Sequence, residues 1–225
     1  MKYFAILLLA VLFISCADKA TNNDTNVTPT KHIIPLRVGN TWYYKSNNSL
    51  TNFKDSVQVF VSEKTTVGNI DWYKFAKTSG FSSGMLESFL GVMIGDIDHP
   101  ELHYVSNKQD GYYHVYAEDA SKLITSTGAI FWKYPVSNNH NYNTVFHAKS
   151  SAILLNIKVD SLNSTITTSA GSFECIIYTF DTYSSSGQVS AKYKYYISPS
   201  VGVIKCEITN SKYTETIELY RYILG

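Results

Sequence analysis

The sequence predicts a mainly β protein in which a single antiparallel sheet, a half-barrel or barrel-like meander, carries one short helix. Three observations lead to this prediction. β-branched and aromatic residues dominate the chain after residue 32, and 18 of the 225 residues are Tyr. Turn residues recur at short intervals, and connections this short join antiparallel neighbours. Because flat sheets of ~10 strands are rare, the predicted sheet must curl.

The first sixteen residues have the pattern of a secretory signal. Lys2 gives a positive start, an apolar run from Phe4 to Ile14 follows, and the small residue Ser15 precedes Cys16. This run is shorter than the ~20 residues of a membrane-spanning helix, which favours a signal that is removed. The alternative is an ordinary signal peptide that happens to contain a cysteine.

The four residues Phe13-Ile14-Ser15-Cys16 resemble the lipobox of bacterial lipoproteins, with Phe13 in place of the usual Leu or Val. The resemblance implies that residues 1–15 are removed as a signal peptide and that Cys16 is acylated. It implies an outer-membrane lipoprotein of the cell envelope, facing either the periplasm or the cell surface. Two or more acyl chains give durable anchoring, so the membrane is the first expected partner.

Residues 16–31 are expected to form a lipidated, flexible tether, because Asp18 to Thr30 has no apolar periodicity and is rich in Asn and Thr. The antiparallel β domain is expected over residues 32–225. One of the 19 basic residues lies in the signal, which leaves 18 basic against 18 acidic side chains. A neutral chain of this kind offers no electrostatic footprint for nucleic acid.

Short runs of strand-forming residues, separated by turn residues, define the expected strands. In Val203–Thr209, apolar and polar residues alternate, as in a sheet with one face in water. The expected strands are Thr41–Ser46, Ser56–Lys64, Ile70–Thr78, Leu102–Ser106, Tyr112–Ala117, Ala152–Asp160, Ser164–Thr168, Phe173–Tyr183, Val189–Ile197, Val203–Thr209 and Tyr213–Ile223.

Cys175 and Cys206 are expected to be free, buried thiols. They lie on strands that flank a shared middle strand, and two strand spacings are ~9.5 Å, whereas bridged Cα atoms lie within ~7 Å. An unpaired buried cysteine then acts as a small apolar side chain.

One segment has helical spacing instead, with Ser83 as N-cap and Gly95 as the stop. The alternative is a buried strand pair kinked at Gly91. A helix here would fill the concave face of a curved sheet. Its apolar stripe is Met85, Leu86, Phe89, Leu90 and Met93.

The stretch Pro35-Leu36-Arg37-Val38-Gly39-Asn40-Thr41-Trp42 resembles the opening of a large group of uncharacterised Gram-negative lipoproteins. Residues 168–175 and 200–205 resemble the hairpins that close the same proteins. The resemblance implies a β-rich envelope domain and brings no activity with it. A looser similarity is to the lipoprotein-carrier half-barrels, at the level of architecture alone.

Two motifs could carry chemistry, and for both a structural interpretation is favoured. Gly80-Phe81-Ser82-Ser83-Gly84 matches the nucleophile elbow of hydrolases, but no alternating strand–helix pattern supplies the parallel sheet that this elbow needs. The run from Asp96 to His103 contains five potential metal ligands, but Pro100 prevents a continuous helix and the ligand spacing fits no known site. His114, His140 and His147 are expected to be surface or hydrogen-bonded residues.

The sequence thus predicts a non-enzymatic, lipid-anchored protein of the cell envelope, with no catalytic, cofactor-binding or metal site. Its expected role is that of a binding or assembly component with an apolar concave face. The alternative is a surface glycan- or protein-binding module, because aromatic faces stack on sugar rings. A serine hydrolase using Ser82 is the third hypothesis. The expected partners are an apolar ligand, a glycan or an envelope protein.

Overall fold

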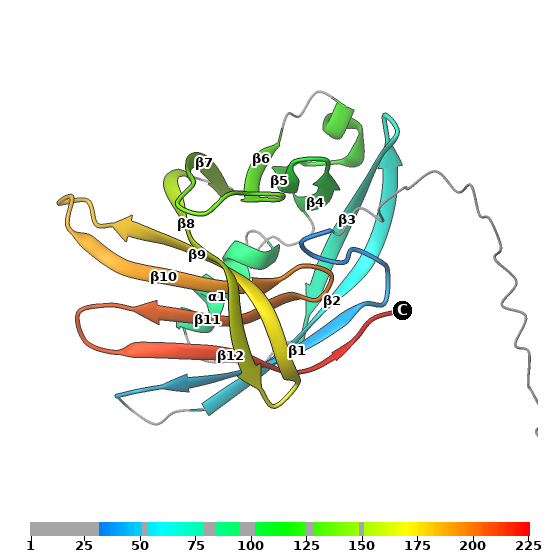
Figure 1. The fold of residues 1–225 in the computed structure, drawn as a ribbon. Helices are drawn as coiled ribbons and strands as arrows, with labels where there is room; N and C mark the ends of the chain where they lie inside the picture. The colour runs from blue at the N-terminus through cyan, green and yellow to red at the C-terminus, as the bar shows by residue number, and fades with distance from the viewer. Residues whose placement is uncertain (1–31, 51–53, 79–83, 95–101, 125–127, 149–150) are drawn as a thin grey trace, which may run out of the picture. The chain divides into compact units, whose positions relative to one another are not determined.

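The computed structural model describes residues 32–50, 54–78, 84–94, 102–124, 128–148 and 151–225 (Figure 1). These residues are part of one compact unit. They contain one α-helix, α1 (Gly84–Ile94), and a short 3₁₀ turn, η2 (Ala120–Ile124). The strands are β1 (Thr41–Asn48), β2 (Lys54–Val67), β3 (Ile70–Lys77), β4 (His103–Lys108), β5 (Gly111–Tyr116), β6 (Ala129–Lys133), β7 (Asn141–Ala148), β8 (Ser151–Thr168), β9 (Gly171–Tyr183), β10 (Val189–Ser198), β11 (Gly202–Thr209) and β12 (Thr214–Ile223).

All twelve strands belong to one antiparallel sheet that is nearly closed into a barrel, which confirms the predicted fold class. The order across the sheet is β6-β5-β4-β3-β2-β1-β12-β11-β10-β9-β8-β7. The sheet therefore consists of two six-strand meanders, one from each half of the chain. Pairing of β1 with β12 joins them over the length of both strands.

The residues of the Pro-Leu-x-Val-Gly-Asn-x-Trp opening hold the two ends of the domain together. The Asn40 side chain donates a hydrogen bond to the Pro35 carbonyl and accepts one from the Gly225 amide, both at 2.9 Å. The indole of Trp42 is fully buried and donates to the Val201 carbonyl at 2.6 Å. These contacts make the opening a structural clasp, since buried polar groups need partners.

The long β8–β9 hairpin bends over the outer face of the sheet (Figure 1). The register between β8 and β9 shifts at Ser161 and again before Ser164, and bulges of this kind bend a strand pair. Beyond the bend, the ring of Phe173 lies 6.0 Å from that of Tyr222 on β12, centroid to centroid. The sequence predicts two separate strands here, Ala152–Asp160 and Ser164–Thr168, whereas the structure has one bent but continuous strand, β8.

The two edges of the sheet, β6 and β7, meet through side chains. The hydroxyl of Tyr142 on β7 donates to the Phe131 carbonyl at 2.8 Å and accepts from the Lys133 amide at 3.3 Å. The hydroxyl of Tyr178 on β9 donates to the Lys133 carbonyl at 2.6 Å. Two tyrosine hydroxyls thus satisfy three edge groups of β6 that a neighbouring strand would otherwise pair. We call this contact the β6/β7 seam.

Candidate functional site

The interior of the sheet is filled with side chains. Its core is unusually aromatic, and the rings contact one another at centroid distances of about 5–6 Å, the range in which aromatic pairs are stabilising. The concave face is therefore apolar, as expected, but it is occupied by the protein itself. The fully buried aromatic residues facing this core include Trp42, Tyr44, Tyr112, Phe131, Trp132, Tyr178 and Tyr195.

Helix α1 lies in this interior, as the helical spacing predicts. Phe89 and Leu90 are fully buried and Met93 is almost so. The Phe89 ring lies 4.9 Å from Tyr44, edge to face, and 6.0 Å from Tyr195, stacked. The helix therefore plugs the sheet from inside. The side chains of Met85 and Leu86, and the predicted cap residues Ser83 and Gly95, lie outside the described residues.

The interior is apolar apart from a few buried polar groups, among them the carboxyl group of Glu215, which lies on the same face of β12 as Ile217 and Leu219. Burial raises the pKa of Tyr44, Tyr112 and Tyr195 well above the ordinary value. His114 is buried, with its ring 4.9 Å from Tyr112 and 5.2 Å from Phe131, which corrects the expectation of a surface or hydrogen-bonded residue. Burial, and then the neighbouring His103, lower its pKa to about 3, so its imidazole is neutral at pH 7.

The two thiols are free and buried, which confirms their prediction. β10 lies between the strand of Cys175 and that of Cys206. Cys206 faces the interior beside Tyr195, its cross-strand partner, whereas Cys175 lies on the other face of β9. Burial raises the pKa of Cys175 to about 12 and that of Cys206 well above its usual value. Neither is a reactive thiolate at neutral pH.

Several of the residues that the sequence suggests for chemistry lie outside the described part of the chain. Ser82, Cys16 and residues 96–101 of the potential metal run fall outside the described residues. The last residue of that run, His103, is buried, with its ring 5.2 Å from Tyr116. Over the part of the chain that the structure describes, no three His, Cys, Asp or Glu residues are grouped to hold a metal ion. None of the described helices is long and apolar enough to cross a membrane.

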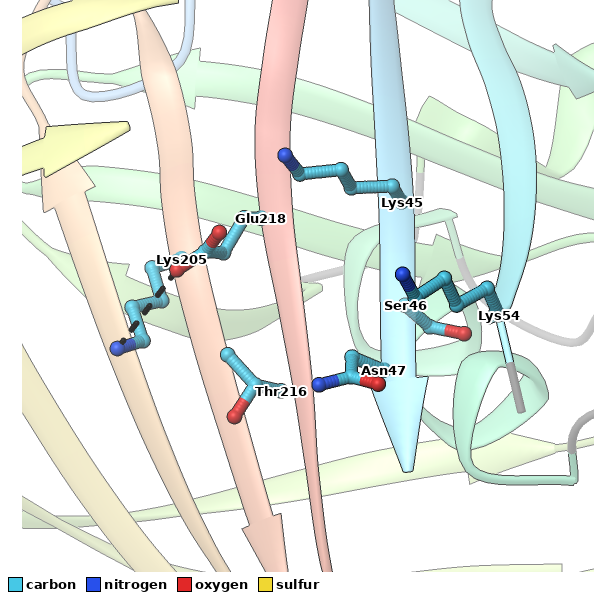
Figure 2. A pocket seen from close by; sticks show the side chains of 7 residues that line it. All are labelled: Lys45, Ser46, Asn47, Lys54, Lys205, Thr216 and Glu218. Carbon is cyan, nitrogen blue, oxygen red and sulfur yellow. Dashed lines mark ion pairs between the residues drawn. The ribbon is translucent and has the colours of Figure 1, made fainter. Parts of the chain in front are cut away.

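A polar groove of about 460 Å³ lies on the outer face, where β2, β1, β12 and β11 are neighbours (Figure 2). Lys45, Glu218 and Lys205 are successive cross-strand partners and therefore share one face. The next row along the strands contains Lys54, Asn47 and Thr216. We call this the basic groove. It is lined by Lys45, Ser46, Asn47, Lys54, Lys205, Thr216 and Glu218.

The lysines of the basic groove differ in their partners. Lys205 contacts Glu207 at 2.9 Å and Glu218 at 3.9 Å. Burial alone would raise the pKa of Glu207, but the hydrogen bonds from Lys205 and Tyr196 and the charges of Lys205 and Lys194 together hold that pKa below its usual value. Lys45 donates a 3.5 Å hydrogen bond to the neutral Ser169 hydroxyl at the tip of the β8–β9 hairpin. Within the described residues, no carboxylate pairs with Lys45 or Lys54.

A second groove, of about 500 Å³, lies beside the bend of the β8–β9 hairpin. It contains two aromatic rings, those of Tyr134 and Phe173, besides apolar and hydroxyl side chains, the carboxylate of Glu174 and the amide of Asn163. We call this the mixed groove. Its lining consists of Tyr134, Pro135, Val136, Leu162, Asn163, Ser172, Phe173, Glu174, Ile176, Ser198 and Pro199.

Sequence reasoning proposed none of the residues of either groove as a site. The lysines come from strands that are far apart in the chain, and only the pairing of β1 with β12 brings Lys45 next to Glu218. Which residues of each strand share a face could nevertheless be predicted, because residues on one face of a strand recur with a period of two. The missing information was the order of the strands.

Comparison with known proteins gives a partial family match and a general fold similarity. Residues 136–216, less than half of the chain, match a family described as DUF3108-like. A candidate lipoprotein from Parabacteroides distasonis has 13% sequence identity and a TM-score of 0.43, over 86% of this chain and 99% of that one. A candidate exported protein with a YmcC-like fold, from Bacteroides fragilis, has 10% identity and a TM-score of 0.47, over 85% and 98%. No curated protein matches the chain.

Proposed function

We propose that this protein is a lipid-anchored component of the cell envelope that binds a partner through the outer face of its sheet and has no catalytic role. The anchor is the acylated Cys16, following removal of residues 1–15. Because the mature chain is formally neutral, acyl chains rather than charge hold it at the membrane.

The observation that carries this proposal is the filled interior. A carrier of apolar ligands needs a cavity, and ligand sites are typically about 300–1,000 Å³. In this sheet the concave face is packed with rings and with Phe89 and Leu90 of helix α1. The basic groove and the mixed groove reach such volumes, and the basic groove lies on the outer face.

A non-catalytic role is supported by the lining of the two grooves. Nucleophilic catalysis requires a nucleophile within hydrogen-bond reach of a base. Among the described residues that line either groove there is no histidine and no cysteine. His103, His114 and Cys206 are packed in the interior, away from either groove.

One observation favours a second candidate function, that of an apolar-ligand carrier. The β6/β7 seam is closed by the hydroxyls of Tyr142 and Tyr178, and no strand ladder between β6 and β7 is among the pairings of the described residues. Opening of the seam would expose a largely apolar interior. This candidate requires α1 to leave its place, whereas binding on the outer face requires no rearrangement.

Anchoring is tested by intact-mass measurement of the mature protein purified from a membrane fraction. We expect the mass of residues 16–225 plus acyl chains. Cys16→Ser should yield no acylated species, because the acyl chain attaches to the thiol. An unmodified N-terminus on the mature wild-type protein would refute the anchor.

The site of binding is tested with a secreted version, in which a standard cleavable signal replaces residues 1–16. Native mass spectrometry after addition of palmitate should show only unliganded protein, because the interior is full. Tyr142→Phe serves as the matched variant with a loosened seam. A stoichiometric palmitate complex of the wild-type version would refute binding on the outer face alone and favour the carrier.

A further inference from the structure

We propose that the basic groove binds an acidic oligosaccharide, with the ammonium groups of Lys45 and Lys54 on its carboxylates. This inference rests on the proposed function, which it deepens by naming a groove and a class of ligand.

The positions of the two lysines suit an anion with more than one charge. Lys45 is the cross-strand partner of Ser56, and Lys54 is the partner of Asn47, so the lysines form a diagonal pair on adjacent strands. The Cβ atoms of such a pair lie roughly 7 Å apart. Figure 2 shows the Lys45 ammonium extending toward β12 and the Lys54 ammonium toward β1, on the same side of the sheet. Both side chains are exposed and available to a ligand.

The third lysine has a different task. Lys205 pairs with both Glu207 and Glu218, so the three groups together carry one negative charge, and Glu207 also accepts a 3.0 Å hydrogen bond from Tyr196. This network fixes Glu218 at the border of the groove, where its carboxylate can accept a hydrogen bond from a hydroxyl group. The net positive charge of the groove therefore comes from Lys45 and Lys54.

The remaining lining favours a saccharide over a peptide. Asn47 and Thr216 offer an amide and a hydroxyl group, which match the alternating donors and acceptors of a sugar. Peptide sites are built around apolar or aromatic anchors, and none lines the described part of this groove. At about 460 Å³ the groove has the size of a typical small-molecule site, which is far more than a free phosphate ion fills.

The test uses the lipidated full mature chain in an uncharged detergent at 20 mM salt, with tetragalacturonate as the probe and titration calorimetry as the readout. The neutral maltotetraose and inorganic phosphate serve as comparison ligands. The double variant Lys45→Gln, Lys54→Gln removes both ammonium groups. Lys192→Gln is the matched control, because Lys192 is an exposed strand lysine outside the groove.

We expect tetragalacturonate to bind, with at least a tenfold loss of affinity in the double variant and less than a twofold change in the control. Binding should also weaken severalfold between 20 mM and 200 mM salt, because exposed charges are screened. If maltotetraose binds as tightly as tetragalacturonate, charge has no role in binding. If inorganic phosphate competes as well as the sugar does, the ligand is not a saccharide. If the double variant binds tetragalacturonate with unchanged affinity, the basic groove is not the binding site.

Failure of this inference and failure of the proposed function are distinguishable. If tetragalacturonate does not bind at all, the inference is wrong, while membrane anchoring and the absence of a palmitate complex still support an anchored protein that binds on its outer face. If palmitate forms a stoichiometric complex, the proposed function fails whatever the result with the sugar.

Discussion

Truncation of Phe89 to alanine should destabilise the protein strongly, because this ring is the centre of the contact between helix α1 and the sheet. Phe89 is fully buried, and truncation of a buried Phe costs about 3–5 kcal/mol. The ring also forms two aromatic pairs, with Tyr44 and Tyr195, each contributing about 0.5–1.5 kcal/mol beyond burial. We therefore expect the upper half of that range, ~4–5 kcal/mol, a large share of the 5–15 kcal/mol that is typical of a domain.

Thermal melts of the secreted version measure this effect. For a unit of this size, each kcal/mol lowers Tm by about 2–4 °C, so Phe89→Ala should melt ~8–20 °C below the wild type. The matched control is Leu154→Ala, which removes an apolar side chain that is 67% exposed and should change Tm by less than ~2 °C. A Phe89→Ala melt as close to wild type as that of the control would refute the plug and place α1 in a docking or lid role.

Three further predictions concern other parts of the core. After denaturation without reductant, Cys175 and Cys206 should each take up one maleimide, and a bridged, unlabelled species would contradict the strand order. In the unfolded chain His114 takes up a proton near pH 6.5, whereas in the folded chain burial lowers its pKa to about 3. Between these two values the unfolded chain binds more protons than the folded chain. The free energy of unfolding should therefore fall as the pH falls, by ~1.4 kcal/mol per pH unit. Urea midpoints at pH 7 and pH 5 measure this loss, and His114→Gln should reduce it; an equal loss in the variant would assign it to other groups. Tyr142→Phe should lower the free energy of unfolding by about 1–3 kcal/mol and speed amide exchange in β6, because the Phe131 carbonyl and the Lys133 amide lose this hydroxyl as partner. Unchanged exchange would show that the seam does not depend on that hydroxyl.

Strands with clear alternation and strong turn residues could be predicted from the sequence, often to within one or two residues. The turn at Gly68 and Asn69 is an example, because both residues adopt positive φ angles, of 59° and 62°, which Gly and Asn tolerate best. β6 and β7 were missed. β6 contains the strand formers Ile130, Phe131 and Trp132 but is only five residues long, and the start of β7 is rich in Asn, which has weak strand propensity.

The candidate site was far less readable than the fold. The sequence shows how many aromatic residues the chain has, but not which of them face water and which face the interior. That depends on the register of the strands, because a shift of one residue moves every side chain to the other face. His114 illustrates this difficulty, since a histidine between Tyr113 and Val115 could face either side of the strand, and in the structure its imidazole lies beside Tyr112 and Phe131. The basic groove could not be predicted, because it depends on the pairing of β1 with β12, which joins the two halves of the chain.

The pairing of β1 with β12 also sets an order of events during synthesis of the chain. Strands β1 to β6 can form their meander as soon as they emerge, since each pairs with the next in sequence. The second edge of β1, however, is left without its partner until Thr214–Ile223 has been made. An exposed strand edge is a template for aggregation, and β1 carries the buried residues Trp42 and Tyr44. The time between the emergence of the first strand and that of the twelfth is thus the interval in which the chain depends most on protection by a chaperone.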